Sequence, residues 1–135
     1  MSYLIETDLL SLTERKHTPQ KLLTWLSNTR DIFVSVVSMA ELRHGAKTAP
    51  LTHRPALEAW ISDVRRDYAA AIEPLDEVVL VRWKELLAEL KSKNRIMTCE
   101  DSLIAATALH HGHTLATHTT RHFTPAGVAL VDPLD

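Results

Sequence analysis

The chain has 135 residues, 45% of them hydrophobic, and a formal net charge of −2 at pH 7. This length predicts one domain over residues 1–135 with its own core, and the charge excludes a protein that is basic over its whole surface. No apolar run reaches the roughly 18 residues of a membrane span, and the start lacks the features of a secretory signal. We therefore expect a cytoplasmic protein with no membrane segment. The single cysteine, Cys99, excludes an internal disulfide and a thiolate zinc cage.

The first half of the chain alternates between short apolar runs and helical patterns. The stretch "YLIETDLL" at 3–10 begins as a buried strand, and Thr18 and Pro19 predict a helix with Thr18 as N-cap and Pro19 at the first helical position. The β-branched run at 31–37 predicts a central strand. From Pro55 onward, apolar residues recur at helical spacing, which predicts a long amphipathic helix.

The second half continues the same alternation. Residues 71–75 predict a short connecting strand, and helices are predicted to start at Asp76 and at Asp101. The runs "HTLAT" at 113–117 and "GVALVD" at 127–132 predict two late strands. This order is typical of an α/β fold with a mainly parallel sheet that helices cover on both faces.

Acidic residues follow the predicted strands at the positions where the chain turns into a helix. Glu6 and Asp8 follow the first strand, Glu41 lies one helical turn after the second, and Asp101 opens a later helix. Because ligands of open parallel sheets bind beyond the carboxyl ends of the strands, we expect these side chains to converge on one rim. Clustered carboxylates repel one another unless a cation neutralises them, and their hard oxygens suit Mg²⁺ or Mn²⁺.

Each of these acids also has a purely structural interpretation. Ser38 with Glu41, and Thr98 with Asp101, have the spacing of a capping box, in which an acid satisfies a free backbone N–H at a helix start. The two acids after the first strand could complement a helix dipole. Capping does not explain why all of them fall where a parallel sheet gathers its ligands, so the coincidence favours a metal site.

A second group of potential ligands is less persuasive. Five histidines lie within thirteen positions: His110, His111, His113, His118 and His122. Imidazole is a common zinc ligand, but the first three flank Gly112 at a predicted helix end, where histidine complements the dipole, and no HExxH spacing occurs. The sequence therefore argues against a histidine metal site. The lack of a GxSxG elbow argues equally against Ser-His-Asp catalysis.

Several motifs, in order along almost the whole chain, resemble one family. "YLIETDLLSL" at 3–12 is similar to a family opening of the form hydrophobic-DTN-hydrophobic-L-S, and "VSVVSMAELRHGAK" at 34–47 to a strand followed by S/T-x-x-E-L-x-x-G. "EDSLIAATALHHGHTLAT" at 100–117 resembles D-x-x-IAA-x-A with its following strand, and "TTRHF" at 119–123 with "GVALVDP" at 127–133 resembles the usual ending. The family is that of the PIN-domain ribonucleases, and within it the VapC-type toxins of toxin–antitoxin pairs.

The resemblance implies a Rossmann-like α/β/α sandwich that cleaves RNA phosphodiesters with Mg²⁺ or Mn²⁺. By position it implies catalytic roles for Glu6, Glu41 and Asp101. It implies metal ligation by the same three acids and by Asp8. Thr7 would hold the site by its hydroxyl, and Thr117 is a further supporting candidate. The implied partners are a cognate VapB-type antitoxin, an RNA substrate and a second copy of the chain in a homodimer. The sequence does not identify RNA-binding residues or the RNA target.

Two departures from the family pattern leave a second function open. Glu6-Thr7-Asp8 stands where the family has Asp-Thr-Asn, so the first acid is one methylene longer, and the late fourth acid of many members is missing from the run that contains Thr119 and His122. A weakened PIN domain that binds an antitoxin or RNA without cutting is therefore the alternative. A phosphate-receiver domain fits less well, because it needs a phosphoacceptor Asp after a central strand and a late Lys.

Overall fold

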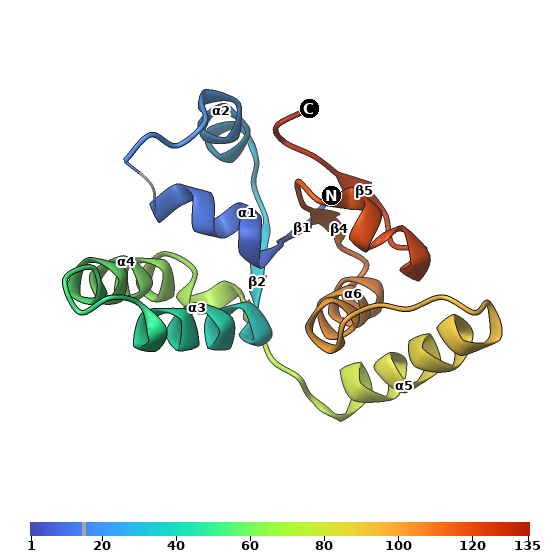
Figure 1. Ribbon diagram of the computed structural model, residues 1–135. Coiled ribbons are helices and arrows are strands. Elements are labelled where there is room, and N and C mark those ends of the chain that lie inside the picture. The colour runs from blue at the N-terminus through green and yellow to red at the C-terminus, as the bar shows by residue number, and fades with distance from the viewer. Residues whose placement is uncertain (15) are drawn as a thin grey trace.

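Five short parallel strands and the helices around them make up the computed structural model, which describes residues 1–14 and 16–135 (Figure 1). The strands are β1 (Tyr3–Ile5), β2 (Ile32–Ser35), β3 (Ile72–Glu73), β4 (Thr114–Ala116) and β5 (Leu130–Val131). The α-helices are α1 (Thr7–Ser11), α2 (Gln20–Asn28), α3 (Val36–Thr48), α4 (Arg54–Asp67), α5 (Glu77–Ser92) and α6 (Cys99–His111). Short 3₁₀ turns are η1 (Leu12–Glu14), η2 (Ala69–Ala71), η3 (Thr120–His122) and η4 (Thr124–Ala126).

The strand order places β1 at the centre of the sheet. The order is β3-β2-β1-β4-β5, with every pair parallel, and Ile5 is in register with Val34 of β2 and Ala116 of β4. From β1 the chain first builds outward through β2 and β3, then crosses to β4 on the other side. The sheet therefore has its topological switch point between β1 and β4, where ligands of such folds bind at the carboxyl ends.

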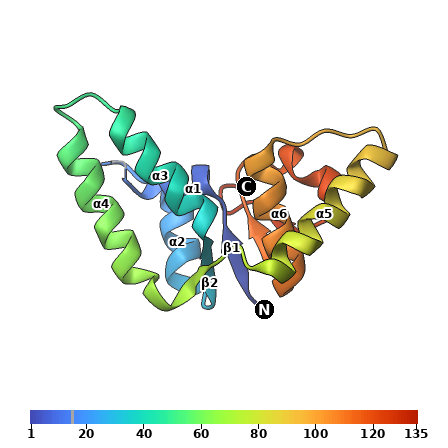
Figure 2. The same ribbon diagram turned by 90° about the horizontal axis from the view of Figure 1, so that it is seen from below.

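Helices lie on both sides of the sheet (Figure 2). A hydrophobic layer on each face holds them against it. On one face Leu4 and Leu115 pack with α5 and α6, and on the other Ile5, Val34 and Ala116 pack with α1 to α4. Adjacent strand residues point to opposite faces, so both Leu4 and Ile5 are fully buried. The predicted α/β class with a parallel sheet is confirmed. Among the described helices, none is both long and apolar enough to cross a membrane.

Two predicted boundaries in the first half were wrong by a few residues. Pro19, not Thr18, is the N-cap of α2, because its ψ of 134° is extended and its carbonyl accepts hydrogen bonds from the backbone N–H groups of Leu22 and Leu23. The strand predicted at 31–37 covers only β2. Ser35 caps α3 by accepting a hydrogen bond from the backbone N–H of Val37, which ends the strand inside a β-branched run.

The starts of α3 and α6 test the two capping boxes. Ser38 lies inside α3 and Ser35 is the N-cap, so the predicted capping role of Ser38 and Glu41 was wrong. Thr98 does cap α6, accepting from the backbone N–H of Asp101, but the helix starts at Cys99, before the predicted Asp101. The cap uses the backbone N–H of Asp101, and a side-chain hydrogen bond from Thr98 also reaches the Asp101 carboxyl group and lowers its pKa, although burial raises the pKa more.

Candidate metal centre at the carboxyl end of the sheet

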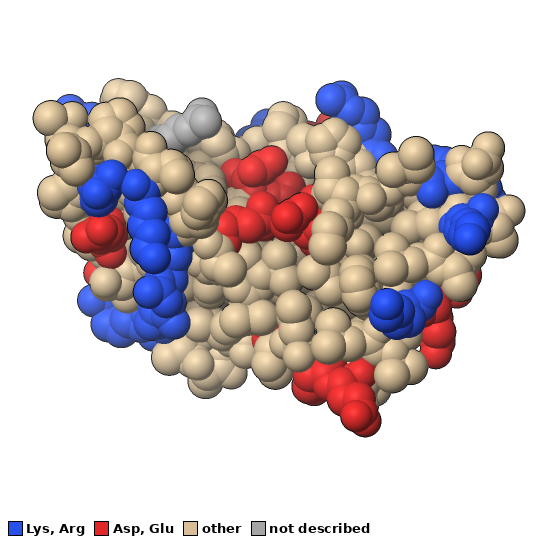
Figure 3. Space-filling model, turned by 60° about the horizontal axis from the view of Figure 1, so that its bottom comes forward, with Lys and Arg blue, Asp and Glu red and all other residues tan. Residues whose placement is uncertain are grey.

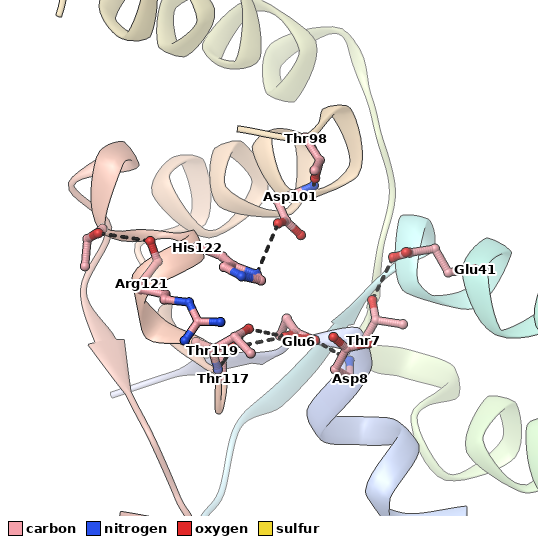
Figure 4. Close-up of polar contacts among 11 residues, drawn as sticks. Glu6, Thr7, Asp8, Glu41, Thr98, Asp101, Thr117, Thr119, Arg121 and His122 are labelled. Atoms are coloured by element: carbon pink, nitrogen blue, oxygen red, sulfur yellow. Dashed lines mark hydrogen bonds and ion pairs between the residues drawn. The ribbon is translucent and has the colours of Figure 1, made fainter. Parts of the chain in front are cut away.

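Glu6 lies directly after the central strand and is held on both sides. It is the N-cap of α1, and its Oε2 accepts a hydrogen bond from the backbone N–H of Asp8. Its Oε1 accepts from the hydroxyl of Thr117 at 2.9 Å and from that of Thr119 at 3.4 Å (Figure 4). Only 3% of Glu6 is exposed. The switch point between β1 and β4 thus contains a buried carboxyl group oriented by hydrogen bonds from both strand ends.

Thr7 links this strand end to α3. Its hydroxyl donates to Oε1 of Glu41 at 2.8 Å, and it lies 2.7 Å from the hydroxyl of Ser38. Because the Thr7 proton goes to Glu41, the Ser38 hydroxyl donates to Thr7. The buried side of α3 therefore fixes Thr7, and Thr7 in turn orients the Glu41 carboxylate toward the rim, as Figure 4 shows.

Asp101 approaches the same rim from the first turn of α6. Its carboxylate faces His122 across 4.0 Å, and both residues line a pocket with Arg121 (Figure 4). Asp8 is exposed at the start of α1 and lines a neighbouring pocket with Thr7 and Glu41. Acidic side chains accordingly gather in a hollow between the two helical halves of the molecule (Figure 3).

The structure thus brings together the predicted site residues, which we call the rim group: Glu6, Thr7, Asp8, Glu41, Asp101 and Thr117. They come from the ends of β1 and β4, from the first turns of α1 and α6, and from the second turn of α3. Sequence reasoning missed the Ser38 hydroxyl as a support for Thr7, and it did not foresee that Thr119 would contact Glu6. The sequence carried no signal that separates Ser38 from Ser35, because both lie near the start of the same helical pattern.

The carboxyl groups of the rim group disturb one another. Burial raises the pKa of Glu6, and the negative charges of Asp8 and Asp101 raise it further. Partial burial likewise raises the pKa values of Glu41 and Asp101, with added repulsion from Asp8 and Glu100. Hydrogen bonds to these carboxyls oppose the rise without cancelling it. The rim is therefore a place where a cation would relieve both repulsion and lost hydration.

The donor set fits a hard divalent ion. Carboxylate and hydroxyl oxygens predominate among the side chains of the rim group. The imidazole of the neighbouring His122 faces the Asp101 carboxylate and not a second nitrogen or sulfur ligand. Such a set matches Mg²⁺ or Mn²⁺ better than Zn²⁺ or copper. Glu6, Asp8, Glu41 and Asp101 are the residues that could hold it.

The raised pKa values predict a characteristic pH dependence of the metal-free protein. An acid with a raised pKa binds its proton more tightly in the folded state, so its contribution to stability is complete below the ordinary pKa of about 4 and is lost as pH rises through the raised value. We expect Glu41→Gln and wild type to melt at similar temperatures at pH 4, and the variant to be the more stable at pH 7 without metal. Equal melting temperatures at both pH values would show that neither burial nor neighbouring charge disfavours the charged form of Glu41.

Comparison with known proteins agrees with this geometry. The PIN domain family matches residues 3–124. The chain belongs to the PIN-domain family. It is 30% identical to Toxin FitB of Neisseria gonorrhoeae over 96% of each chain, and 26% identical to VapC ribonuclease Y4jK of Sinorhizobium fredii over 96% of this chain and 95% of the relative.

Comparison with solved structures points to the same group of proteins. A crystal structure of FitAcB from Neisseria gonorrhoeae superposes on this PIN domain with a TM-score of 0.89 at 27% identity, and 97% of each chain is covered. The family resemblance drawn from the sequence motifs and the PIN-domain fold are both confirmed.

Proposed function

We propose that this PIN domain is a metal-dependent endoribonuclease and the toxin of a toxin–antitoxin pair. The observation that carries the proposal is the convergence of four acidic residues from three separate parts of the chain on one rim, with raised pKa values for Glu6, Glu41 and Asp101. The names of its relatives, a toxin and a VapC ribonuclease, point to the same activity. Cytoplasmic localisation is part of this proposal, because the proposed RNA substrates are cytoplasmic and a free, exposed cysteine suits a reducing compartment.

In this proposal Glu6, Asp8, Glu41 and Asp101 hold Mg²⁺ or Mn²⁺, and Thr7 and Thr117 position two of the acids through their hydroxyls. When bound, the ion supplies an activated water and offsets charge on the phosphodiester. The protein itself orients the carboxyl groups. Glu6 is fixed by donors from α1 and β4, so little reorganisation is needed when a cation and a phosphate arrive.

Basic side chains near the rim supply contacts for the RNA backbone. Arg121 and His122 lie beside Asp101, and Arg43, Lys47 and Arg65 line a pocket on the α3–α4 half of the molecule. Figure 3 shows Lys and Arg side chains on both sides of the acidic hollow. Phosphates bound to these side chains would place the chain of RNA across the rim despite the net charge of −2.

The direct test is to incubate the purified protein with total RNA and Mn²⁺ and to separate the products on a denaturing gel. We expect discrete fragments with Mn²⁺ and none with EDTA. Glu100→Gln is a matched control, because Glu100 is an exposed acid beside the rim that is not a proposed ligand. Intact RNA from the wild-type protein under all metal conditions would contradict the enzyme.

A specific observation also favours the second function, a PIN domain that binds an antitoxin or RNA without efficient cutting. Both carboxylate oxygens of Glu6 already accept hydrogen bonds from the protein, and Thr117 and Thr119 stand near the position of the missing fourth acid. These hydroxyls orient Glu6 but add no negative charge. Tight RNA binding without fragments in the cleavage assay would favour this function.

An apolar surface on α5 is available for the proposed protein partner. Val78 and Val81 are 54% and 52% exposed, and Leu80 and Val81 line a shallow pocket with Trp83. Exposed apolar side chains grouped on one helix are typical of partner contacts. The proposed occupant is the antitoxin, and a homodimer of the chain is a separate proposal.

Co-expression tests this surface. We expect the product of the neighbouring small reading frame to co-purify with wild type, and the double variant Val78→Glu/Val81→Glu to lose it, because two charges would be buried in the interface. Leu51→Glu is the control, since Leu51 is 75% exposed on another part of the surface. Equal recovery with both variants would contradict the assignment. Light scattering of the protein alone tests the homodimer, for which twice the 15.2 kDa of one chain is expected.

A further inference from the structure

A second group of ligand-type side chains lies away from the rim, and we call it the Glu73–histidine cluster: Glu73, His111 and His113. Nε2 of His113 lies 2.9 Å from Oε1 of Glu73, and Nε2 of His111 lies 3.2 Å from Oε2. One ligand atom from each residue can be chosen so that all three lie within 4.8 Å of one another. Two imidazoles therefore direct the same ring nitrogen at one carboxylate.

The spacing of these atoms is close to that of a tetrahedral zinc site. Two ligands at about 2.0–2.1 Å from zinc and at the tetrahedral angle lie about 3.3 Å apart. The nitrogen–oxygen distances of 2.9 and 3.2 Å are close to this value, but they run to the two different oxygens of Glu73, so the carboxylate has to turn if one oxygen is to serve as the ligand. The two histidines have to approach each other, and the His111 side chain, 27% exposed at the end of α6, has room to turn.

The buried histidine is oriented as metal-binding histidines usually are. The Nδ1 of His113 lies 2.6 Å from the Ser2 hydroxyl, which leaves Nε2 for Glu73 or for a metal. The His113 ring stacks on Phe33 at 4.6 Å between centroids, and its side chain is 5% exposed. Ser2 and Phe33 thus fix the ring on two sides, so the ligand nitrogen is positioned before any ion binds.

The Glu73–histidine cluster is separate from the rim group. Asp101 lies in the first turn of α6 and His111 is its last residue, so ten residues at a rise of 1.5 Å place them about 15 Å apart along the helix. His113 precedes β4, whereas Thr117 follows it. The two groups therefore occupy opposite ends of the same helix and strand.

We propose that Glu73, His111 and His113 form a binding site for a Zn²⁺-class transition-metal ion, with water in the fourth position. Two imidazoles and one carboxylate are a ligand set that zinc accepts, and imidazole suits Zn²⁺ better than Mg²⁺. The ion would join the edge strand β3 to the end of α6 and the start of β4, which are not neighbours in the sheet. Its role is to stabilise the fold, not to cleave RNA.

Cobalt titration tests the proposal, because tetrahedral Co²⁺ absorbs strongly in the visible range and substitutes for zinc. The titration is performed on the Glu41→Gln/Asp101→Asn variant, so that the rim group does not compete. We expect saturable visible bands at one Co²⁺ per chain, displaced by Zn²⁺. His111→Ala in this background should weaken Co²⁺ binding by roughly 100-fold or more, because even the loss of an outer-shell partner of a ligand costs about 10–100-fold.

His110→Ala is the matched control, because His110 is the exposed neighbour of His111 and is not part of the cluster. It should bind Co²⁺ as the parent does. Zn²⁺ at one hundred times its Kd should raise Tm by about 5–10 °C in the parent and in His110→Ala, and not in His111→Ala. Absent visible bands, or equal binding by His111→Ala and the parent, would show that Glu73 and the histidines form only polar contacts with one another and no metal site. RNA cleavage by His111→Ala with an intact rim should equal that of wild type.

Discussion

Asp101→Asn should reduce Mn²⁺-dependent RNA cleavage by roughly 100-fold or more while the metal-free protein keeps or gains stability. The loss follows because a charged oxygen that holds the cation is replaced by a neutral amide. The stability follows because the pKa of Asp101 is raised by partial burial and by Asp8 and Glu100, so removal of its charge relieves an unfavourable interaction. RNA fragment yield and thermal melts with EDTA measure the two effects.

The two effects separate the metal role from a capping role. Thr98 caps α6 through the backbone N–H of Asp101, which Asn retains. If the Asp101 carboxylate were needed for the helix start, the variant would lose about 0.5–2 kcal/mol of stability. A destabilised variant that still cleaves RNA at the wild-type rate would contradict the proposed role of Asp101.

Substitutions at Glu6 should show the second large effect, and they test the residue that departs from the family pattern. Glu6→Gln keeps the shape but removes the charge, and we expect roughly 100-fold less cleavage. Glu6→Asp keeps the charge but retracts the carboxylate from Thr117 and from the backbone N–H of Asp8, both of which it contacts in the wild type. We expect a several-fold loss of Mn²⁺ affinity and activity, because the surrounding donors fit the longer acid.

The opposite result for Glu6→Asp would also be informative. Higher Mn²⁺ affinity and faster cleavage than wild type would show that the extra methylene displaces the carboxylate from its proper place. Full activity in both Glu6→Gln and Glu6→Asp would remove this residue from the site altogether. Asp8→Asn, measured in the same assay, shows whether the exposed neighbouring acid carries part of the charge.

The arrangement of the rim group could be predicted because it depends on one general property of parallel sheets. All strand carboxyl ends face the same edge, so acids placed after β1, after β2 and at the start of α6 had to approach one another. The predicted helix from Pro55 and the late strands depended on clear periodicity or β-branched runs and were found close to their predicted places. Strong local patterns and the parallel topology were therefore sufficient to predict these elements and the position of the rim group.

Other features depended on contacts between residues far apart in sequence. Ser35 and Ser38 both lie near the start of a helical pattern, so the sequence does not show which of them is the cap. In the structure Ser35 caps α3, and Ser38 contacts Thr7 of α1. The Glu73–histidine cluster could not be found from histidine spacing alone, because Glu73 and His113 are 40 residues apart. Its carboxylate comes from an edge strand of only two residues.

The most direct test of the central claim is Mn²⁺ binding at the rim, measured by electron paramagnetic resonance of free Mn²⁺ in a titration of the His111→Ala variant. That background removes the Glu73–histidine cluster as a competing site. We predict saturable binding that weakens at least tenfold when either Glu41→Gln or Asp101→Asn is added, because each removes a charged ligand of the same ion. Mn²⁺ affinity unchanged by both substitutions would contradict a shared metal centre at the carboxyl end of the sheet.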